Sequence, residues 1–262
     1  MHPILFHLGS FGVHTYGVMG ALGFLAASYV ILRRSRAMYL NRDRVVDIIF
    51  WTSLAAVVGA RAVFVFQDWG RLHGPMDWVN IRQGGLVFYG ALLFGLPVAA
   101  WLIKRYSIPF YAFMDIVATA LPLGHGFARI GCFTAGCCYG RTTSLPWAVT
   151  FTDPGSAAPL DVPLHPVQLY EAAGLFALAG LCAWVYARKR FDGQVMLTYL
   201  LGYAVLRTIT EAFRGDARGW FLEPLLGHTL STSQGLSILV AIAALGVFLW
   251  DARRARTAAR EG

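Results

Sequence analysis

The sequence LGHGFARIGCFTAGCCYG occupies residues 123–140, and it leads to the sequence LHPVQLYE at residues 164–171. The two stretches place basic, acidic, amide and thiol side chains in a chain that is otherwise very apolar. Ionisable groups inside a lipid bilayer are costly, so they indicate a functional site by default. We therefore expect the chemistry of this protein to be concentrated in these two stretches.

The composition of the whole chain is that of a membrane protein. Hydrophobic residues make up 57% of its 262 residues and charged residues only 14%, whereas a soluble domain has about 25% charged residues. A helix needs about 20 apolar residues to cross the hydrocarbon core of a bilayer. Seven segments approach that length: residues 11–32, 45–66, 85–103, 109–123, 167–187, 194–213 and 232–250.

These segments follow one another too closely to leave room for a soluble domain. We expect an all-α integral membrane protein, with residues 1–262 forming a single polytopic domain of seven transmembrane helices. A small outward-facing loop region, residues 124–166, would connect the fourth and fifth helices. No basic region or cleavage pattern precedes the first segment, so we expect that segment to remain in the mature protein.

Basic residues predict the orientation of the helices. Most lysines and arginines follow the first, third, fifth and seventh segments, and such connections face the cytoplasm. The N-terminus is therefore expected outside and the C-terminus in the cytoplasm. The formal net charge of +8 follows this rule and suits contacts with anionic membrane lipids. We expect no nucleic-acid partner, because no basic stretch carries a recognition motif.

The sixth apolar segment contains charged residues at helical spacing. Tyr203, Arg207, Glu211 and Arg214 fall on one stripe of the expected helix. The stripe indicates either an Arg207–Glu211 pair that neutralises itself or a functional group within the membrane. Arg61, at the end of the second segment, is expected to be paired, to extend toward the membrane surface, or to line the substrate site.

Polar residues also mark the start of the fifth segment. His165, Gln168 and Glu171 recur at three-residue intervals around Pro166, and a proline is accepted at the start of a helix. They predict one polar face, which would either line a substrate site or satisfy loop backbone groups. Pro122 predicts a kink or a helix end just before the central motif.

Arginines suggest what the site binds. Guanidinium groups bind phosphate bidentately and keep their charge when partly buried. A phosphate-bearing ligand that enters a membrane site from the side would be a phospholipid. Two arginines, Arg129 and Arg207, would also stabilise the charge that develops when that phosphate departs. We therefore expect transfer of a group from a phospholipid, with no cofactor.

The cysteines of the central motif allow three interpretations. Cys132, Cys137 and Cys138 form a C-x4-C-C pattern, which could be a disulfide on an oxidising outer face, a set of metal ligands, or small residues that pack a turn. A metal site is disfavoured because no fourth ligand is evident and the spacing is not that of zinc. We expect packing or a disulfide, and no metal; Cys182 is expected to pack within a helix.

The sequence resembles one family, the prolipoprotein diacylglyceryl transferases of bacterial membranes. The resemblance covers the first, third, fourth, fifth and sixth segments in order. The stretches that carry it are HTYGVMGALGF, GGLVFYGALLFG, LPLGHGFARIGCFTAGCCYGR, LHPVQLYEA and YAVLRTITEAFRG. Seven spans and an outward-facing site are also typical of the family.

The resemblance implies a reaction and a location. Members of this family move an sn-1,2-diacylglyceryl group from phosphatidylglycerol to the lipobox cysteine thiol of a preprolipoprotein, which forms a thioether and releases glycerol 1-phosphate. The location would be the bacterial cytoplasmic (inner) membrane.

The resemblance also implies roles for individual residues. Arg129 and Arg207 would hold the phosphate, Glu211 would orient Arg207 or assist proton movement, and Tyr16 and Gly140 would shape the lipid site.

This chain departs from the family pattern at several positions. Many members have a histidine, a proposed base for the acceptor thiol, where this chain has Tyr89, and asparagine and glutamate where Cys132 and Cys137 stand. An ordinary tyrosine, with a pKa of about 10, is a poor base at neutral pH. The thiol proton would then go to Glu211, His165, water or the lipid phosphate.

Two alternatives to this reaction stay open at the level of the sequence. One is a divergent relative that serves another acceptor, and the other is a membrane protein that binds phospholipid without catalysis. A transporter is disfavoured, because only one interrupted region is evident.

Overall fold

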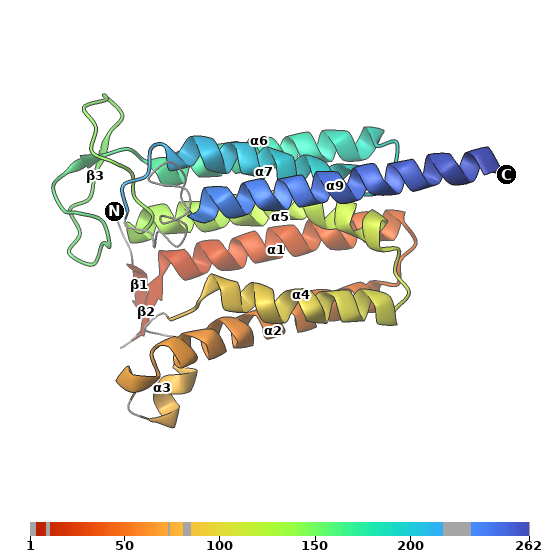
Figure 1. Ribbon diagram of the computed structural model, residues 1–262. Coiled ribbons are helices and arrows are strands. Elements are labelled where there is room, and N and C mark those ends of the chain that lie inside the picture. The colour runs from red at the N-terminus through yellow and green to blue at the C-terminus, as the bar shows by residue number, and fades with distance from the viewer. Residues whose placement is uncertain (1–3, 9–10, 73, 81–84, 217–231, 262) are drawn as a thin grey trace. The chain divides into compact units, whose positions relative to one another are not determined.

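The computed structural model describes residues 4–8, 11–72, 74–80, 85–216 and 232–261. Most of these residues are helical, and five helices are long and apolar enough to cross a membrane. These are α1 Thr15–Ala37, α2 Arg42–Gln67, α4 Phe88–Arg105, α5 Phe110–Ala135 and α6 Val167–Arg188 (Figure 1). They correspond to the first five expected spans. The segments expected as the last two spans are helical, within α7 Gln194–Glu211 and α9 Thr232–Glu261, but neither helix is among these five.

The chain forms two compact units. Residues 32–113 make up one unit, and residues 1–31 together with residues 114–262 make up the other.

In the unit of residues 32–113, α2 and α4 pack closely through glycines. A Cβ atom at Gly59 would lie 2.5 Å from the carbonyl oxygen of Gly90, so only glycine allows this approach of the two backbones. A short 3-10 helix, Trp69–Arg71, and the helix α3 Pro75–Val79 lie between α2 and α4 in the sequence.

The other unit begins with a hairpin. Strand β1 Ile4–Leu8 pairs antiparallel with strand β2 Phe11–His14, and Leu8 is paired with Phe11 in the backbone register. The expected first span, from residue 11, was therefore wrong at its start, because helix α1 begins at Thr15. The alternation of large apolar and other residues in FGVH suits a paired strand.

Helix α5 continues through Pro122, so the helix does not end before the central motif, one of the two outcomes expected from this proline. Proline removes one helical hydrogen bond, but membrane helices accept prolines where neighbouring helices compensate. A Cβ atom at Gly23 of α1 would lie 2.6 Å from the carbonyl oxygen of Gly124, so α1 packs tightly against α5 directly after the proline. Arg129 and Cys132 therefore lie on a helix, and the loop begins after Ala135 rather than at residue 124.

The loop after α5 is folded back on itself. Strand β3 Val149–Thr150 pairs antiparallel with strand β4 Pro163–Leu164. The buried side chains of Phe151, Ala158 and Leu164 form a small hydrophobic core within this loop.

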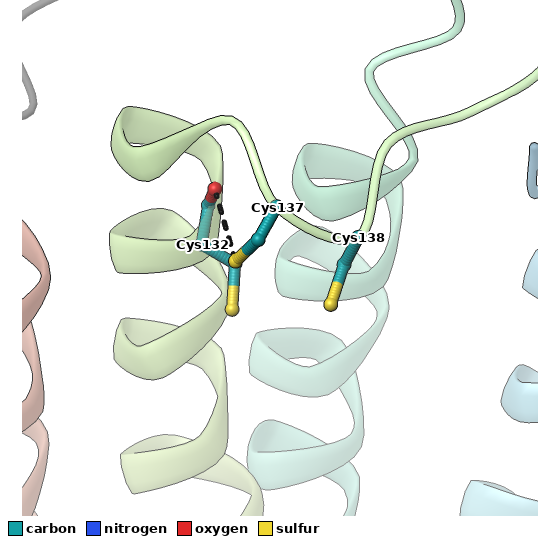
Figure 2. A group of neighbouring side chains, drawn as sticks. All are labelled: Cys132, Cys137 and Cys138. Atoms are coloured by element: carbon teal, nitrogen blue, oxygen red, sulfur yellow. Dashed lines mark hydrogen bonds between the residues drawn. The ribbon is translucent and has the colours of Figure 1, made fainter. Parts of the chain in front are cut away.

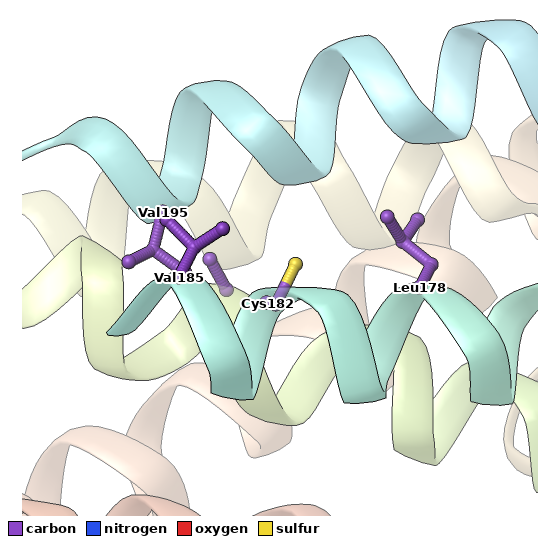
Figure 3. Close-up of a cluster of buried hydrophobic side chains, with 5 residues drawn as sticks. Leu178, Cys182, Val185 and Val195 are labelled. Atoms are coloured by element: carbon purple, nitrogen blue, oxygen red, sulfur yellow. The ribbon is translucent and has the colours of Figure 1, made fainter. Parts of the chain in front are cut away.

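Helix α6 packs against α7, and α7 packs against α9. The core between α5, α6 and α7 contains Leu178, Cys182 and Val185 of α6 with Val195 of α7 and Ala118 of α5 (Figure 3). Cys182 is fully buried there, which confirms its expected packing role.

A buried carboxylate fixes the connection between α6 and α7. Asp115 of α5, which has no exposed surface, accepts hydrogen bonds from the backbone N–H groups of Gly193 and Val195 at 2.9 Å and of Met196 at 3.1 Å. Lys189 Nζ donates to the same carboxylate at 3.0 Å. Burial alone would lower the pKa of Lys189, but its hydrogen bonds to Asp192 and Asp115 raise that pKa above its usual value. The start of α7 is therefore capped by α5.

Candidate functional site

The expected polar residues converge on one buried carboxylate. Glu171, on the first turns of α6, has no exposed side-chain surface. Its Oε1 lies 3.1 Å from a terminal nitrogen of Arg129 on α5, and its Oε2 lies 3.7 Å from terminal nitrogens of Arg207 on α7 and Arg214 just after α7. Three elements thus bring three guanidinium groups to one carboxylate.

Two further carboxylates balance the charge of this cluster. Glu211 forms an ion pair with Arg207 one turn along α7. Asp216 accepts two hydrogen bonds from Arg214, at 2.9 Å to Nε and 2.8 Å to a terminal nitrogen. The predicted Arg207–Glu211 pair is therefore present, but it is one part of a larger network of three arginines and three carboxylates.

The arginines differ in their exposure. The Arg129 side chain is 14% exposed, whereas that of Arg207 is 2% exposed. An anion of a substrate can therefore reach Arg129 more readily than Arg207. Arg129 Nε lies 3.2 Å from His125 Nε2, one turn earlier on α5, and the His125 ring packs against Tyr203 of α7. These contacts orient the most accessible guanidinium.

Arg214 and its supporting residues were not selected from the sequence as site residues. Arg214 follows Arg207 and Glu211 on the predicted stripe, so the stripe contained the signal for it. Burial alone would lower the pKa of Arg214, but hydrogen bonds to Asp216 and Cys138 raise it above its usual value. The third guanidinium therefore stays charged. Tyr203 belongs to the same stripe, whereas His125 gave no comparable signal, because its role depends on the packing of α5 against α7.

The three residues at the start of α6 have different roles. Only Glu171 enters the arginine cluster. Gln168 is buried and donates from Nε2 to the carbonyl oxygen of Cys137 at 2.9 Å. His165 Nδ1 lies 3.4 Å from the hydroxyl of Tyr170. Gln168 therefore does not line the cluster; it supplies a hydrogen bond to a backbone carbonyl of the loop, the second of the two roles expected for this face.

Gly140 serves the close packing of backbone. A Cβ atom there would lie 2.6 Å from the Cβ atom of His165 and 2.7 Å from a methyl group of Val167. The residues on either side of Gly140 pair with the segment after α7: Arg141 N–H donates to the Phe213 carbonyl at 2.8 Å, and Gly215 N–H donates to the Tyr139 carbonyl at 3.1 Å. This pairing brings Arg214 to the cluster.

Tyr16 lies at the start of α1, beside α5. Its side chain is half exposed. A Cβ atom at Gly131 would lie 3.2 Å from the Tyr16 Cα atom, so the two helices approach closely two residues beyond Arg129. Tyr16 is thus near the same end of α5 as the arginine cluster.

Two predicted site residues, Arg61 and Tyr89, belong to the other unit. Arg61 donates to the backbone carbonyls of Trp78 at 2.9 Å and Gly85 at 3.0 Å, and to that of Asp77, so its guanidinium is paired by backbone. Tyr89 is exposed on the first turn of α4. The carbonyl groups of the segment between α2 and α4 thus offset the cost of placing the Arg61 guanidinium close to the membrane.

Comparison with known proteins identifies relatives of this chain. The family model described as prolipoprotein diacylglyceryl transferase matches residues 3–250. A phosphatidylglycerol–prolipoprotein diacylglyceryl transferase of Clostridium tetani is 33% identical over 98% of this chain and 99% of its own length. Proteins of the same name from Legionella pneumophila strain Lens and Pseudoalteromonas atlantica are each 35% identical, over 97% and 98% of this chain and 98% and 91% of their own lengths.

These matches span nearly the whole chain and include all of the residues that converge on Glu171. The expected resemblance is thereby confirmed. The chain belongs to the prolipoprotein diacylglyceryl transferase family.

Proposed function

We propose that this protein transfers an sn-1,2-diacylglyceryl group from phosphatidylglycerol to the lipobox cysteine of a preprolipoprotein. The convergence of Arg129 and Arg207 on the single carboxylate of Glu171 carries the proposal. Two guanidinium groups that share one carboxylate are close enough to act on one phosphate. The names of the curated relatives support the same donor and the same class of acceptor.

The chemistry follows from the product. The thiol sulfur attacks the sn-3 carbon of the diacylglyceryl group, which bears the phosphate, so a carbon–sulfur bond forms while the bond from this carbon to the phosphate oxygen breaks. The electron pair of the broken bond goes to the phosphate, and glycerol 1-phosphate leaves. Guanidinium groups beside the phosphate stabilise the negative charge that develops on its oxygen as the bond breaks. One well-placed donor of this kind contributes about 100-fold to 1,000-fold in rate.

The two arginines would divide this task. Arg129 is the more exposed and would contact the phosphate directly. Arg207 forms ion pairs with Glu171 and Glu211, and its buried charge would add to the positive potential at the phosphate. Tyr16 and Gly140 would shape the lipid site, while His165 and Gln168 would support the loop beside it.

The proton of the acceptor thiol has four possible destinations: Glu211, His165, water or the leaving phosphate. Tyr89 stands where many relatives have a histidine, and a Tyr89→Phe variant tests whether its hydroxyl takes part. Unchanged transfer in that variant would assign Tyr89 to packing alone.

The proposed setting is the bacterial cytoplasmic membrane. One polytopic domain, residues 1–262, would cross it seven times, with the N-terminus outside. The distribution of basic residues and the five apolar helices support this arrangement. The arginine cluster would then face the outer surface, where preprolipoproteins and phosphatidylglycerol meet, and no nucleic acid is involved.

The test uses purified protein in detergent with phosphatidylglycerol and a lipobox peptide, followed by mass spectrometry of the peptide. We expect a mass gain of one diacylglyceryl group on the cysteine, and none on a matched peptide with serine in its place. Arg129→Ala should abolish the gain, and Arg129→Lys should retain part of it. An unmodified peptide in the presence of bound phosphatidylglycerol would favour a protein that binds lipid without this transfer.

A further inference from the structure

The three cysteines of the central motif converge in the folded protein. Cys132 lies on the last turns of α5, whereas Cys137 and Cys138 lie on the loop that follows (Figure 2). Their Sγ atoms all lie within 4.8 Å of one another, and none of the three forms a disulfide. Three sulfurs around one ion, with metal–sulfur bonds of about 2.3 Å, stand about 4 Å apart. Shifts of less than about 1 Å would therefore complete such a site.

The backbone of the turn holds these three thiols close together. Gly136 and Cys138 both adopt left-handed conformations, with φ of 71° and 60°. For a non-glycine residue such as Cys138 this costs about 1 to 2 kcal/mol, and such strain persists where the surroundings impose it. Gln168 of α6 holds the Cys137 carbonyl, and Gly215 holds the carbonyl of Tyr139. The turn is thus fixed on both sides.

The number and type of the donors indicate the ion. Thiolates are soft ligands that favour monovalent copper, zinc and iron–sulfur clusters. A structural zinc site takes four protein ligands in a tetrahedron. Within the part of the chain that the structure describes, no further histidine, cysteine, aspartate or glutamate joins this group. Three converging sulfurs therefore suit a three-coordinate soft ion better than tetrahedral zinc.

The surrounding charges also suit thiolates. Arg214 hydrogen-bonds to Cys138, and Arg129 lies one turn before Cys132 on α5. Three thiolates around a monovalent ion carry two net negative charges, and positive groups nearby favour the thiolate form of cysteine.

We propose that Cys132, Cys137 and Cys138 form a binding site for monovalent copper. The spacing of the cysteines alone favoured packing or a disulfide, because it did not show that the sulfurs meet at one point. None of its three ligands is a group assigned to the proposed transfer reaction, so copper binding and transfer can be measured separately.

The test is a copper titration of the full-length protein, purified in detergent under reducing conditions. Monovalent copper is supplied as its acetonitrile complex in competition with the chromogenic chelator bathocuproine disulfonate. We expect one copper per chain withdrawn from the chelator. X-ray absorption of the copper-loaded wild-type protein should show three sulfur atoms bound to the copper ion.

Variants assign the ligands. Loss of a residue that only supports a metal ligand costs about 10-fold to 100-fold in affinity, so loss of a ligand itself should cost at least about 100-fold. We expect that loss for Cys132→Ser, Cys137→Ser and Cys138→Ser. Cys182→Ser is the matched control, because Cys182 is a free thiol buried in the α6 core, and its copper affinity should stay at the wild-type value.

Other outcomes overturn the proposal. No copper withdrawn from the chelator, or an equal loss of affinity in Cys182→Ser, would do so. Uptake of divalent zinc but not of monovalent copper would overturn the assignment of the ion. Protein that is isolated with two of the three thiols oxidised, and that takes up no copper after reduction, would show that the cluster forms a disulfide instead.

Discussion

At the scale of single residues, the feature that organises the site is a buried acid. Glu171 holds Arg129, Arg207 and Arg214 at one place, and its full burial makes each of these contacts costly to lose. Removing one partner from a buried ion pair costs about 3 to 5 kcal/mol, because it leaves an uncompensated charge. The arginines should therefore differ in what they contribute to stability.

Arg207→Ala should destabilise the protein more than Arg129→Ala, although both should abolish transfer. Arg207 is the partner of both Glu171 and Glu211, so its loss should lower the free energy of unfolding by about 3 to 5 kcal/mol. Arg129→Ala leaves Glu171 with two other arginines and should cost less. Thermal unfolding in detergent measures both. Arg190→Ala, at an exposed position, is the control and should change stability by less than about 0.5 kcal/mol.

Gly140→Ala should impair both folding and transfer. The new methyl group would overlap backbone and side-chain atoms of His165 and a methyl group of Val167, so the pairing that carries Arg214 must shift. We expect a loss of about 1 to 3 kcal/mol, as for other overpacked positions, and a lower transfer rate. Gly180→Ala is the matched control, since no atom lies within 4 Å of its added Cβ atom. If both variants unfold at the wild-type temperature, Gly140 does not have the packing role described above.

The sequence allowed part of this site to be predicted. Helical spacing on the sixth segment pointed to Arg207 and Glu211, and the structure pairs them. Spacing could not show that Glu171 reaches three arginines, because these come from α5, α7 and the segment after α7. It also could not separate Gln168 from Glu171, which share a face of α6 but contact different partners.

At the scale of helices, the main difference from expectation is the length of α5. Pro122 predicted a helix end or kink because proline lacks an N–H group. The helix nevertheless continues, and Gly124 beyond Pro122 lets α1 pack tightly against α5. Local sequence signals such as proline do not report this packing, whereas the apolar lengths of α2, α4 and α6 followed directly from hydropathy.

Asp115→Ala should destabilise the junction of α6 and α7. The change removes the acceptor for three backbone N–H groups and for Lys189. Loss of a helix cap costs about 1 kcal/mol, and buried donors left without a partner cost about 1 to 3 kcal/mol. We expect a total of about 2 to 4 kcal/mol, measured by thermal unfolding. Asp192→Ala should change little, because the Asp192 side chain is 57% exposed; equal effects of the two variants would exclude a special role for Asp115.

At the scale of the whole molecule, the orientation in the membrane is a prediction that rests on basic residues. A green fluorescent protein fused to the C-terminus should fluoresce, because it folds in the cytoplasm. Alkaline phosphatase fused after Asp153, in the loop between α5 and α6, should be active, because it requires the outer side. An inactive phosphatase fusion together with a dark C-terminal fusion would reverse the proposed topology and place the arginine cluster on the inner side.

Helix α5 contacts the α6–α7 pair at two distant places. Asp115 binds the start of α7, and Arg129 binds Glu171 near the start of α6. At 1.5 Å per residue these two attachments are about 21 Å apart along α5. A helix pair that is attached at two such points cannot pivot about either one. The amide hydrogens of α6 and α7 should therefore be among the slowest in the protein to exchange with deuterium, since their release requires both attachments to break in the same opening event.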